Sequence, residues 1–332
     1  MVPTRTAPPL AGGVLVLAGG LSHERDVSLR SGRRVAEALR DTGIEVEQRD
    51  IDATLLPRLQ EDPPACVLPV LHGESGEDGA VRSVLDVFGI AYVGSPPDAC
   101  RVAFDKPVAK TVVSRAGVRT PAAFTLPAET FRELGAATVM QGLISKLGLP
   151  LVVKPAKGGS ALGCNVVRDA GDIPGAMVNA YAYGDTALVE SFVEGTEVAV
   201  PVVDLGDGPR ALPAVSITPD GGFYDYTARY TAGSTEFEVP AKLDDEVAAE
   251  CARVAVLAHE ALGLRDLSRS DLIVDADGTV WFLEVNVAPG LTETSTVPLS
   301  VEAAGLDLGE LMADLVRGAI GRGTHQHPEG DA

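Results

Sequence analysis

The segment Arg269-Ser-Asp-Leu-Ile-Val-Asp-Ala-Asp-Gly-Thr-Val-Trp-Phe-Leu-Glu-Val-Asn286 consists of two β-rich runs separated by Asp277-Gly278. An Asp-Gly pair in that context predicts a β-hairpin with a two-residue turn, because a type I′ turn needs a positive φ at both positions. In such a hairpin Asp271 pairs with Glu284, and Arg269 pairs with Asn286. Side chains two residues apart on a strand point to the same face, so we expect all four to share one face.

Two carboxylates that face each other across a ladder repel, and a cation between them removes the repulsion. The oxygens of Asp271, Glu284 and Asn286 are hard ligands, which suit Mg²⁺ together with substrate phosphates. A second interpretation is that Arg269 alone neutralises an acidic surface pair. The pairing depends on the length of the turn, since an odd-length loop would shift the register by one residue and separate the two acids.

The composition is that of a globular chain with two or three domains. It has 332 residues, of which 45% are hydrophobic and 22% charged. The formal charge is 27 − 47 = −20, which repels phosphates, so we expect no nucleic-acid partner. No apolar run reaches the roughly 18 residues that span a bilayer, so we expect no membrane segment.

The cysteines indicate the compartment. Cys66, Cys100, Cys164 and Cys251 are widely spaced and form no Cys-x-x-Cys pair. We interpret them as core thiols of a protein in a reducing compartment, and therefore predict a cytoplasmic location.

Strand-like and helix-like runs alternate at the start of the chain, which predicts an α/β domain with a parallel sheet over residues 1–104. The strand-like runs there are Val14–Ala18, Glu45–Asp50, Cys66–Leu71 and Ile90–Val93, with a helix over Val27–Leu39. We expect a central α+β unit at 105–190 and a C-terminal α+β unit at 191–322. The C-terminal unit includes a polar loop at 221–240, and residues 323–332 are expected to form a disordered tail.

Three loops follow predicted strands, and two of them, which contain Gly19-Gly20 and His72, could line one cleft, because clefts form at the carboxyl ends of parallel strands. Lys154 ends an apolar strand and is followed by the glycine-rich loop 155–163, in which backbone N–H groups and Ser160 could bind phosphate. A flexible hairpin tip is the second interpretation, since this loop is no Walker A sequence. The other two loops contain Gly19-Gly20 and His72, and a plain tight turn explains the first equally well.

Taken together and in this order, five motifs resemble the D-alanine–D-alanine ligases of the ATP-grasp superfamily. The resemblance covers about residues 14 to 320. Its motifs are Ala18-Gly-Gly-Leu-Ser-His-Glu-Arg-Asp-Val-Ser-Leu29, Leu71-His-Gly-Glu-Ser-Gly-Glu-Asp-Gly79, Val153–Gly163, Phe223-Tyr-Asp-Tyr-Thr-Ala-Arg-Tyr230 and Glu284-Val-Asn-Val-Ala-Pro-Gly-Leu-Thr292. It implies a three-domain ATP-grasp fold that joins two D-alanines through an acyl phosphate, for peptidoglycan precursors. It also implies a homodimer formed through the N-terminal unit.

The resemblance implies ATP as co-substrate and two Mg²⁺ ions, for which Mn²⁺ substitutes. It gives the metal ligands as Asp271, Glu284 and Asn286. The ATP-binding residues are implied to be Lys106, Lys154, Ser160, Phe223 and Arg229, with Glu190, Ser191 and Val193 at the adenine and Glu197 at the ribose.

The same resemblance assigns the amino-acid substrates. Glu24 anchors the ammonium of the first D-alanine, with His72 in the same subsite, and Tyr230 bridges the loop 221–240 toward Ser160 and Glu24. Arg269 and the N–H of Gly290 stabilise the tetrahedral intermediate. Ser295 contacts the carboxylate of the second substrate, and Thr296 lies in its pocket. Closure of the loop excludes water, which would hydrolyse the acyl phosphate.

Four positions depart from the family pattern: Ala161, Arg229, Val287 and Thr296 stand where serine, lysine, threonine and an apolar residue are usual. A paralogous ligase with another second substrate, such as D-serine or D-lactate, in antibiotic resistance or biosynthesis is therefore the alternative. Tyr230 favours an amine nucleophile. Two further alternatives are a non-catalytic nucleotide-binding protein and a Rossmann oxidoreductase. The chain lacks the Gly-x-Gly-x-x-Gly spacing of the latter.

Overall fold

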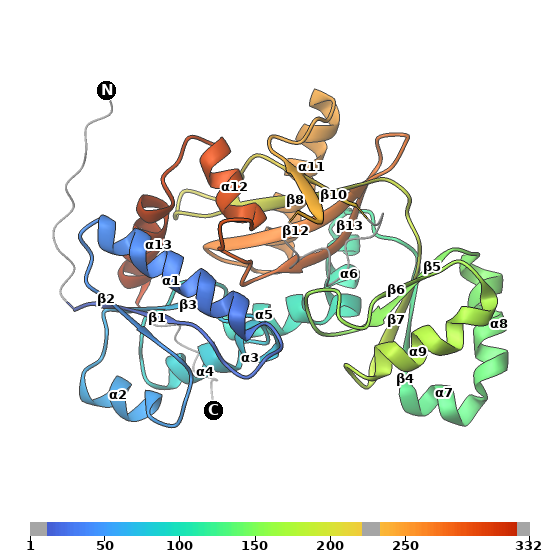
Figure 1. Ribbon diagram of the computed structural model, residues 1–332, viewed down its shortest axis with the longest axis horizontal. Helices are drawn as coiled ribbons and strands as arrows, with labels where there is room; N and C mark the ends of the chain where they lie inside the picture. Colours follow the sequence, from blue (N-terminus) through green and yellow to red (C-terminus); the bar gives the residue numbers. More distant parts are fainter. Residues whose placement is uncertain (1–11, 221–232, 324–332) are drawn as a thin grey trace, which may run out of the picture.

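The computed structural model describes residues 12–220 and 233–323, and within them the strands form three sheets (Figure 1). The first sheet is parallel, in the order β2-β1-β3. Its strands are β1 (Val14–Leu17), β2 (Val46–Arg49) and β3 (Cys66–Pro69). The apolar residues of β1 and β3 are fully buried, as expected of a parallel strand covered on both faces.

Five helices accompany this sheet: α1 (Arg25–Asp41), α2 (Leu55–Glu61), α3 (Glu74–Glu77), α4 (Ala80–Val87) and α5 (Pro97–Phe104). The strand predicted at 90–93 is wrong: Tyr92 makes a single bridge with Val67. The chain turns away at Gly94, whose φ is 112°, so the pairing cannot continue.

The second sheet is antiparallel, in the order β4-β7-β5-β6. It contains β4 (Ala123–Pro127), β5 (Leu151–Pro155), β6 (Asn165–Val167) and β7 (Thr186–Ser191), and α6 (Lys106–Arg115) precedes it. With α7 (Ala128–Leu134), α8 (Ala136–Leu147), the short helix η1 (Ala170–Asp172) and α9 (Ile173–Tyr181), it encloses its own hydrophobic core. This unit lies at one end of the molecule (Figure 1).

The third sheet is antiparallel, in the order β11-β10-β8-β12-β13, with β9 paired to β8. Its strands are β8 (Thr196–Val203), β9 (Arg210–Ala211), β10 (Val215–Pro219), β11 (Thr235–Glu238), β12 (Leu267–Val274) and β13 (Val280–Asn286), with helices α11 (Asp245–Ala261), α12 (Thr296–Ala303) and α13 (Leu308–Arg322). Because β11 pairs with β10, residues 235–238 of the expected loop 221–240 form a strand instead. The domain boundaries at residues 104 and 190 stay a prediction.

The hairpin of β12 and β13 has the predicted pairs but not the predicted turn. The N–H of Asp275 donates to the carbonyl of Thr279 at 3.1 Å, so the loop holds three residues, and Gly278 has a φ of 76°. This odd-length loop shifts the register by one, and a bulge between Asp271 and Leu272 shifts it back. Asp271 therefore does pair with Glu284.

The N-terminal and C-terminal units share a hydrophobic core. Helix α1 packs beside α13, and Val35 and Leu39 contribute to the same cluster as Leu311 and Leu315 (Figure 1). The loops after β1 and β3 are thereby held against the third sheet.

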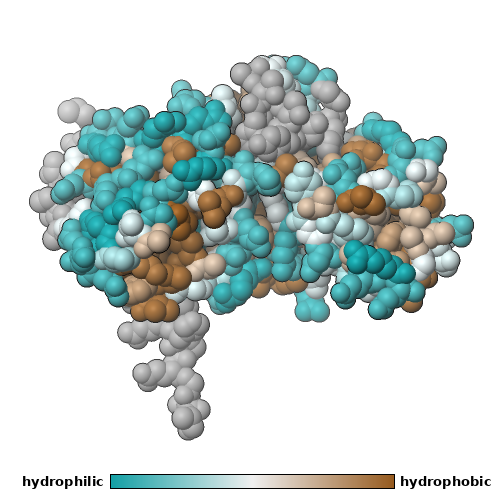
Figure 2. Space-filling model, turned by 60° about the horizontal axis from the view of Figure 1, so that its bottom comes forward, coloured by the Kyte–Doolittle hydropathy of each residue, from teal (hydrophilic) through white to brown (hydrophobic). Residues whose placement is uncertain are grey.

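Apolar side chains are exposed on the face that comes forward in Figure 2, at the end of the molecule that contains the first sheet. Leu56 on α2 and Val84 and Val87 on α4 are all exposed, and Val87 is 81% accessible. None of the helices that the structure describes is both long enough and apolar enough to cross a bilayer.

Candidate active site

A pocket of about 450 Å³ is lined by the second and third sheets and by α1, α3 and the loops that follow β1 and β3 of the first sheet. Every expected site residue within the described ranges lines it. These residues are Glu24, His72, Lys106, Lys154, Ser160, Glu190, Ser191, Val193, Glu197, Arg269, Asp271, Glu284, Asn286, Gly290, Ser295 and Thr296. Residues as far apart in the sequence as Glu24 and Thr296 therefore meet in one cavity, which is large enough for a small ligand.

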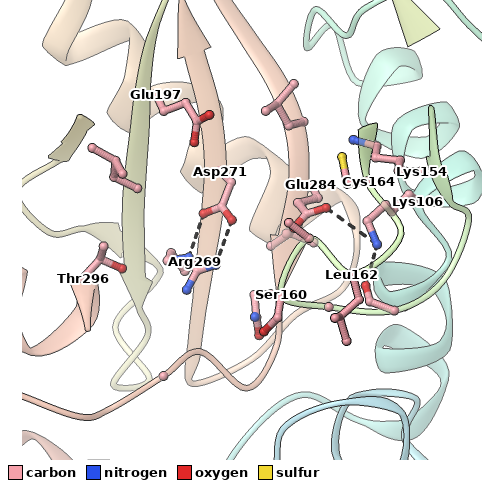
Figure 3. Close-up of a pocket in the computed structure, with 18 of the residues that line it drawn as sticks. Lys106, Lys154, Ser160, Leu162, Cys164, Glu197, Arg269, Asp271, Glu284 and Thr296 are labelled. Atoms are coloured by element: carbon pink, nitrogen blue, oxygen red, sulfur yellow. Dashed lines mark hydrogen bonds and ion pairs between the residues drawn. The ribbon is translucent and has the colours of Figure 1, made fainter. Parts of the chain in front are cut away.

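The acidic pair lies on the wall formed by β12 and β13 (Figure 3). Arg269 binds Asp271 in a bidentate ion pair, with Nε–Oδ1 and Nη2–Oδ2 distances of 2.7 and 2.8 Å. Glu284 faces Lys106 instead, at 3.7 Å from Nζ. Of the two acids, Asp271 is thus held by Arg269, and Glu284 lies near Lys106.

The donor set of this wall suits a hard divalent cation. Asp271 and Glu284 supply carboxylate oxygens, and Asn286 supplies an amide oxygen that already accepts the N–H of Ala288 at 2.9 Å. Within the described residues, no group of three or more His, Cys, Asp or Glu side chains could hold a metal by itself. A metal here would therefore need Asn286 or oxygens of the substrate.

The glycine-rich loop closes over Lys106. Lys106 is the first residue of α6, and its Nζ donates to the carbonyl of Gly158 at 2.6 Å. Ser160 and Ala161 have φ values of 52° and 56°, which non-glycine residues rarely adopt. Ser160 donates a hydrogen bond to Glu24, so this strained turn reaches the N-terminal wall.

A buried cluster of three charges stands behind the loop. Glu190 is 1% exposed; one carboxylate oxygen lies 2.6 Å from Lys154 Nζ and the other is bound by Lys110. Burial alone would raise the pKa of Glu190, but the two lysines outweigh it and the pKa is lowered. Both oxygens of the residue expected at the adenine are thus engaged by lysines, of which Lys110 was not predicted from the sequence.

His72 and Glu77 form the N-terminal wall with Glu24. His72 Nδ1 lies 2.9 Å from the carbonyl oxygen of Ala288, and burial lowers its pKa, which favours the neutral ring. Glu77, also missed, accepts the N–H of Gly73 at 2.8 Å. Burial, together with the charge of Glu24, raises the pKa of Glu77 to about 8, so it is mostly protonated at neutral pH.

The start of α12 forms the far wall. Ser295 Oγ accepts the N–H of Thr292 at 3.1 Å and lies 2.9 Å from the Thr292 hydroxyl. A Cβ at position 290 would lie 2.8 Å from Ser295 Oγ, so only glycine permits this approach. Thr296 is buried, and its hydroxyl oxygen has no hydrogen-bond partner among the described residues.

The cysteine prediction holds for three of the four positions. Cys66, Cys100 and Cys251 are buried, and all four cysteines, which lie in the described ranges, are free thiols. Cys164 instead lines the pocket near Lys154 (Figure 3). Burial raises the pKa of its thiol to about 11, which favours the protonated form at neutral pH.

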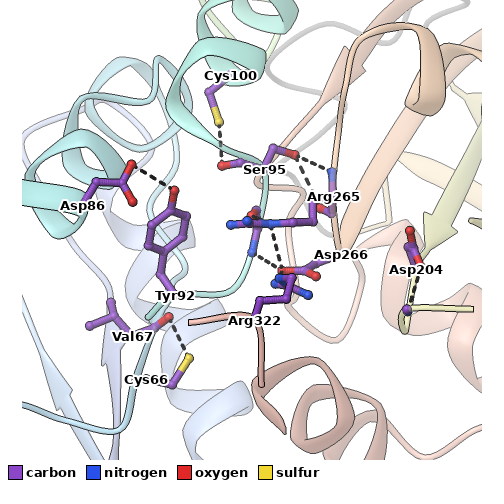
Figure 4. Close-up of polar contacts among 12 residues, drawn as sticks. Cys66, Val67, Asp86, Tyr92, Ser95, Cys100, Asp204, Arg265, Asp266 and Arg322 are labelled. Atoms are coloured by element: carbon purple, nitrogen blue, oxygen red, sulfur yellow. Dashed lines mark hydrogen bonds and ion pairs between the residues drawn. The ribbon is translucent and has the colours of Figure 1, made fainter. Parts of the chain in front are cut away.

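Polar contacts join the N-terminal and C-terminal units next to the start of β12 (Figure 4). Asp266 accepts the N–H of Gly94 and a hydrogen bond from Arg322, both at 2.7 Å. Arg265 Nε donates to the carbonyl of Gly94 at 2.8 Å. Because Asp266 directly precedes the strand of Arg269 and Asp271, these bonds fix that strand relative to the first sheet.

Comparison with known proteins identifies the family. A family model described as the D-ala D-ala ligase C-terminus matches residues 112–317. The D-alanine–D-alanine ligase of Fervidobacterium nodosum is 36% identical over 313 residues, which cover 92% of this chain and 98% of that protein. The ligase of Anaeromyxobacter sp. is 39% identical over 306 residues, covering 92% of this chain and 96% of that protein.

The chain belongs to the D-alanine–D-alanine ligase family.

Solved structures of D-alanine–D-alanine ligases and a related ligase have the same fold as this chain, which confirms the expected ATP-grasp fold. The D-alanine–D-alanine ligase of Bacillus anthracis superposes with a TM-score of 0.77 at 28% identity, covering 94% of this chain and 98% of that one. The VanG D-Ala:D-Ser ligase of Enterococcus faecalis superposes with a TM-score of 0.79 at 25% identity, covering 93% and 100%.

Three expected site residues of this ligase-family chain, Phe223, Arg229 and Tyr230, lie outside the described residues, as does most of the predicted tail.

Proposed function

We propose that the protein joins two D-alanine molecules to D-alanyl-D-alanine with ATP, through an acyl phosphate, for peptidoglycan precursors. The observation that carries this proposal is the convergence of the Asp271–Glu284 pair, Lys106, Lys154 and Arg269 in one pocket. The names of the relatives and the solved ATP complex of the Bacillus anthracis ligase support it.

The nucleotide end of the pocket is the region of Lys106, Lys154 and the glycine-rich loop. The lysine ammonium groups and the loop N–H groups would neutralise and orient the phosphates. Glu284, Asp271 and Asn286 would hold Mg²⁺, two ions for which Mn²⁺ substitutes, and the metal supplies charge neutralisation of the transferring phosphoryl group. Ser191, Val193 and Glu197 line the part of the pocket where adenine and ribose would lie, and Phe223 and Arg229 belong to the same proposal.

At the N-terminal wall, Glu24 would bind the ammonium of the first D-alanine, and neutral His72 would pack in the same subsite. The carboxylate of this D-alanine attacks the γ-phosphorus of ATP, and the bond to ADP breaks. Ser160 already donates to Glu24, so the phosphate loop and the substrate anchor are connected before ligand arrives. Positioning of the two reactants accounts for much of the rate enhancement.

The amine of the second D-alanine then attacks the acyl carbon, and phosphate leaves. Arg269 and the N–H of Gly290 would stabilise the oxyanion, and Ser295 would bind the carboxylate of the second substrate at the N-terminus of α12. We include in this step the part of the predicted loop that precedes β11, residues 221–234. With Tyr230 it would cover the pocket and exclude water from the acyl phosphate.

The test is release of phosphate from ATP over a panel of D- and L-amino acids, with mass detection of the dipeptide. The proposal expects D-alanine to give one phosphate per D-alanyl-D-alanine. It fails if D-alanine releases no more phosphate than buffer does while another amino acid is used. Binding of Mg-ATP without turnover across the whole panel would favour a non-catalytic nucleotide-binding protein.

Thr296 supports one alternative within the family. Its buried hydroxyl has no partner among the described residues, whereas an apolar side chain is usual there, so a more polar second substrate such as D-serine fits the same pocket. The structural similarity to a D-Ala:D-Ser ligase supports this alternative. The panel decides it, because mixed D-alanine and D-serine would then yield mainly the mixed dipeptide.

We also propose a homodimer formed through the N-terminal unit, in the cytoplasm, where ATP is supplied. The exposed Val84 and Val87 of α4 support an interface on that unit. Light scattering of the protein and of its Val87→Asp variant tests this: a dimer that the substitution converts to monomer is expected, and an unaltered monomer contradicts it.

A further inference from the structure

Lys110, Glu190 and Lys154 form a buried triad whose members come from three elements. Lys110 lies on α6, Glu190 on β7 and Lys154 on β5. Glu190 pairs with Val152, two residues from Lys154 on the adjacent strand, so its side chain lies on the same face as Lys154. The three residues are 5%, 1% and 8% exposed, respectively, so water hardly screens their charges.

The triad faces the pocket on one side only. Glu190 and Lys154 line the pocket, whereas Lys110 does not and holds Glu190 from behind. Two ammonium groups and one carboxylate leave one net positive charge in a buried place. That excess charge favours an anionic ligand on the pocket side, where Lys154 is.

The pKa values of the two lysines shift in opposite directions. Burial lowers the pKa of Lys110, although Glu190 opposes this effect. Burial would also lower the pKa of Lys154, but Glu190 and Glu284 outweigh it and the pKa is raised. Lys154 therefore keeps its positive charge at neutral pH.

We infer that Lys110 is a positioning residue that lets Lys154 leave Glu190 and bind the nucleotide phosphates. A buried carboxylate that loses its partner is costly, so Lys154 could not leave if Glu190 had no second cation. Lys110 provides that second cation and does not touch the ligand. The inference rests on the proposed function, since it takes a nucleoside triphosphate to be the anion.

The position of Lys110 on α6 fits this role. Lys106 lies one turn earlier on the same helix and faces Gly158 and Glu284 in the pocket. One helix thus presents Lys106 to the ligand and Lys110 to the residue that retains Lys154. The helix holds the two lysines at a fixed separation, while β5 and β7 carry Lys154 and Glu190, the ion pair that separates when ATP binds.

The first test is Lys110→Met, with ATP affinity measured by titration calorimetry without amino acid and KM measured for both substrates. Without Lys110, Glu190 retains Lys154, so we expect ATP to bind at least about tenfold more weakly. The KM for D-alanine should change by less than about twofold, because Glu24 and His72 are untouched. Lys146→Met, which removes an exposed lysine on α8, is the matched control.

The second test adds Glu190→Gln to Lys110→Met. A neutral glutamine does not retain Lys154, so the double variant should bind ATP more tightly than Lys110→Met alone. Lys110→Arg keeps the positive charge and should preserve ATP affinity within about threefold. It is the variant to measure if Lys110→Met does not fold.

The inference is overturned if Lys110→Met leaves ATP affinity unchanged, if it weakens both substrates equally, or if the double variant binds ATP more weakly than either single variant. Calorimetry requires no turnover. If the wild type binds ATP but ligates nothing, the proposed function fails while the role of Lys110 is still measured.

Discussion

Asp271 lies directly opposite Glu284 across β12 and β13, although the loop between the strands contains three residues instead of two. The bulge leaves Leu283 unpaired between Phe282, which pairs with Leu272, and Glu284. This extra residue cancels the register shift that the loop introduces, and Leu283 and Glu284 both line the pocket. Bulges occur next to active sites, where they redirect a side chain. In this hairpin the bulge directs Glu284 into the pocket.

Replacing Glu284 by glutamine tests the metal assignment. A neutral amide cannot replace an anionic ligand, so we expect turnover to fall by at least about 10³-fold with little change in the unfolding temperature. Glu302→Gln, an exposed change on α12 outside the pocket, should behave like the wild type. Steady-state kinetics measure both, and near-normal turnover of the Glu284 variant would contradict the assignment.

Arg269→Lys tests the oxyanion role. Arginine holds Asp271 with two parallel hydrogen bonds, and lysine offers a single point charge in place of that fork. We expect kcat to fall about 10²-fold, as on loss of one oxyanion donor, with the KM for ATP changed much less. A rise in the KM for ATP at unchanged kcat would instead assign Arg269 to nucleotide binding.

The three-residue turn predicts unequal effects of two neighbouring substitutions. Gly278 has a positive φ and Asp277 does not, so Gly278→Ala should lower the free energy of unfolding by about 1 kcal/mol. Asp277→Ala should cost less. In a type I′ turn both positions would need a positive φ, and equal losses in urea unfolding would therefore contradict the observed loop.

Glu77 makes stability depend on pH. Its pKa rises from 4.5 to about 8 on folding, so the unfolded chain releases this proton at lower pH than the folded protein does. The contribution of protonated Glu77 to the free energy of unfolding is therefore fully present below about pH 4.5, and it is lost as pH rises toward 8. Relative to Glu77→Gln, the wild type should lose unfolding free energy between pH 5 and pH 9, measured with urea. A constant difference between the two would show that the pKa is not raised.

The sequence predicted the parallel sheet of the N-terminal unit and the acidic pair, and the family motifs predicted which described residues line the pocket. The predicted pairing of Asp271 with Glu284 is confirmed, but the predicted two-residue turn is wrong. The three-residue loop shifts the register by one residue, and the bulge shifts it back. One signal was available: the buried residues of β13 are Val280, Phe282 and Val285, and their alternation breaks between Phe282 and Val285.

Lys110 and Glu77 could not be found from local patterns. Lys110 is 80 residues from Glu190, and a lysine on a helix is usually solvated. Glu77 ends the four-residue helix α3, and its burial depends on the packing of other segments. Cys164 was assigned to the core for the same reason, because nothing local distinguishes a pocket wall from a packed interior.

The most direct test of the account is a crystal structure with ADP, Mg²⁺ and a phosphinate mimic of the dipeptide. We predict Mg²⁺ bound by oxygens of Asp271, Glu284 and Asn286 at about 2.0–2.1 Å, with the remaining positions filled by phosphate and phosphinate oxygens. A metal bound elsewhere in the pocket, or Asp271 and Glu284 turned away from it, would contradict the account.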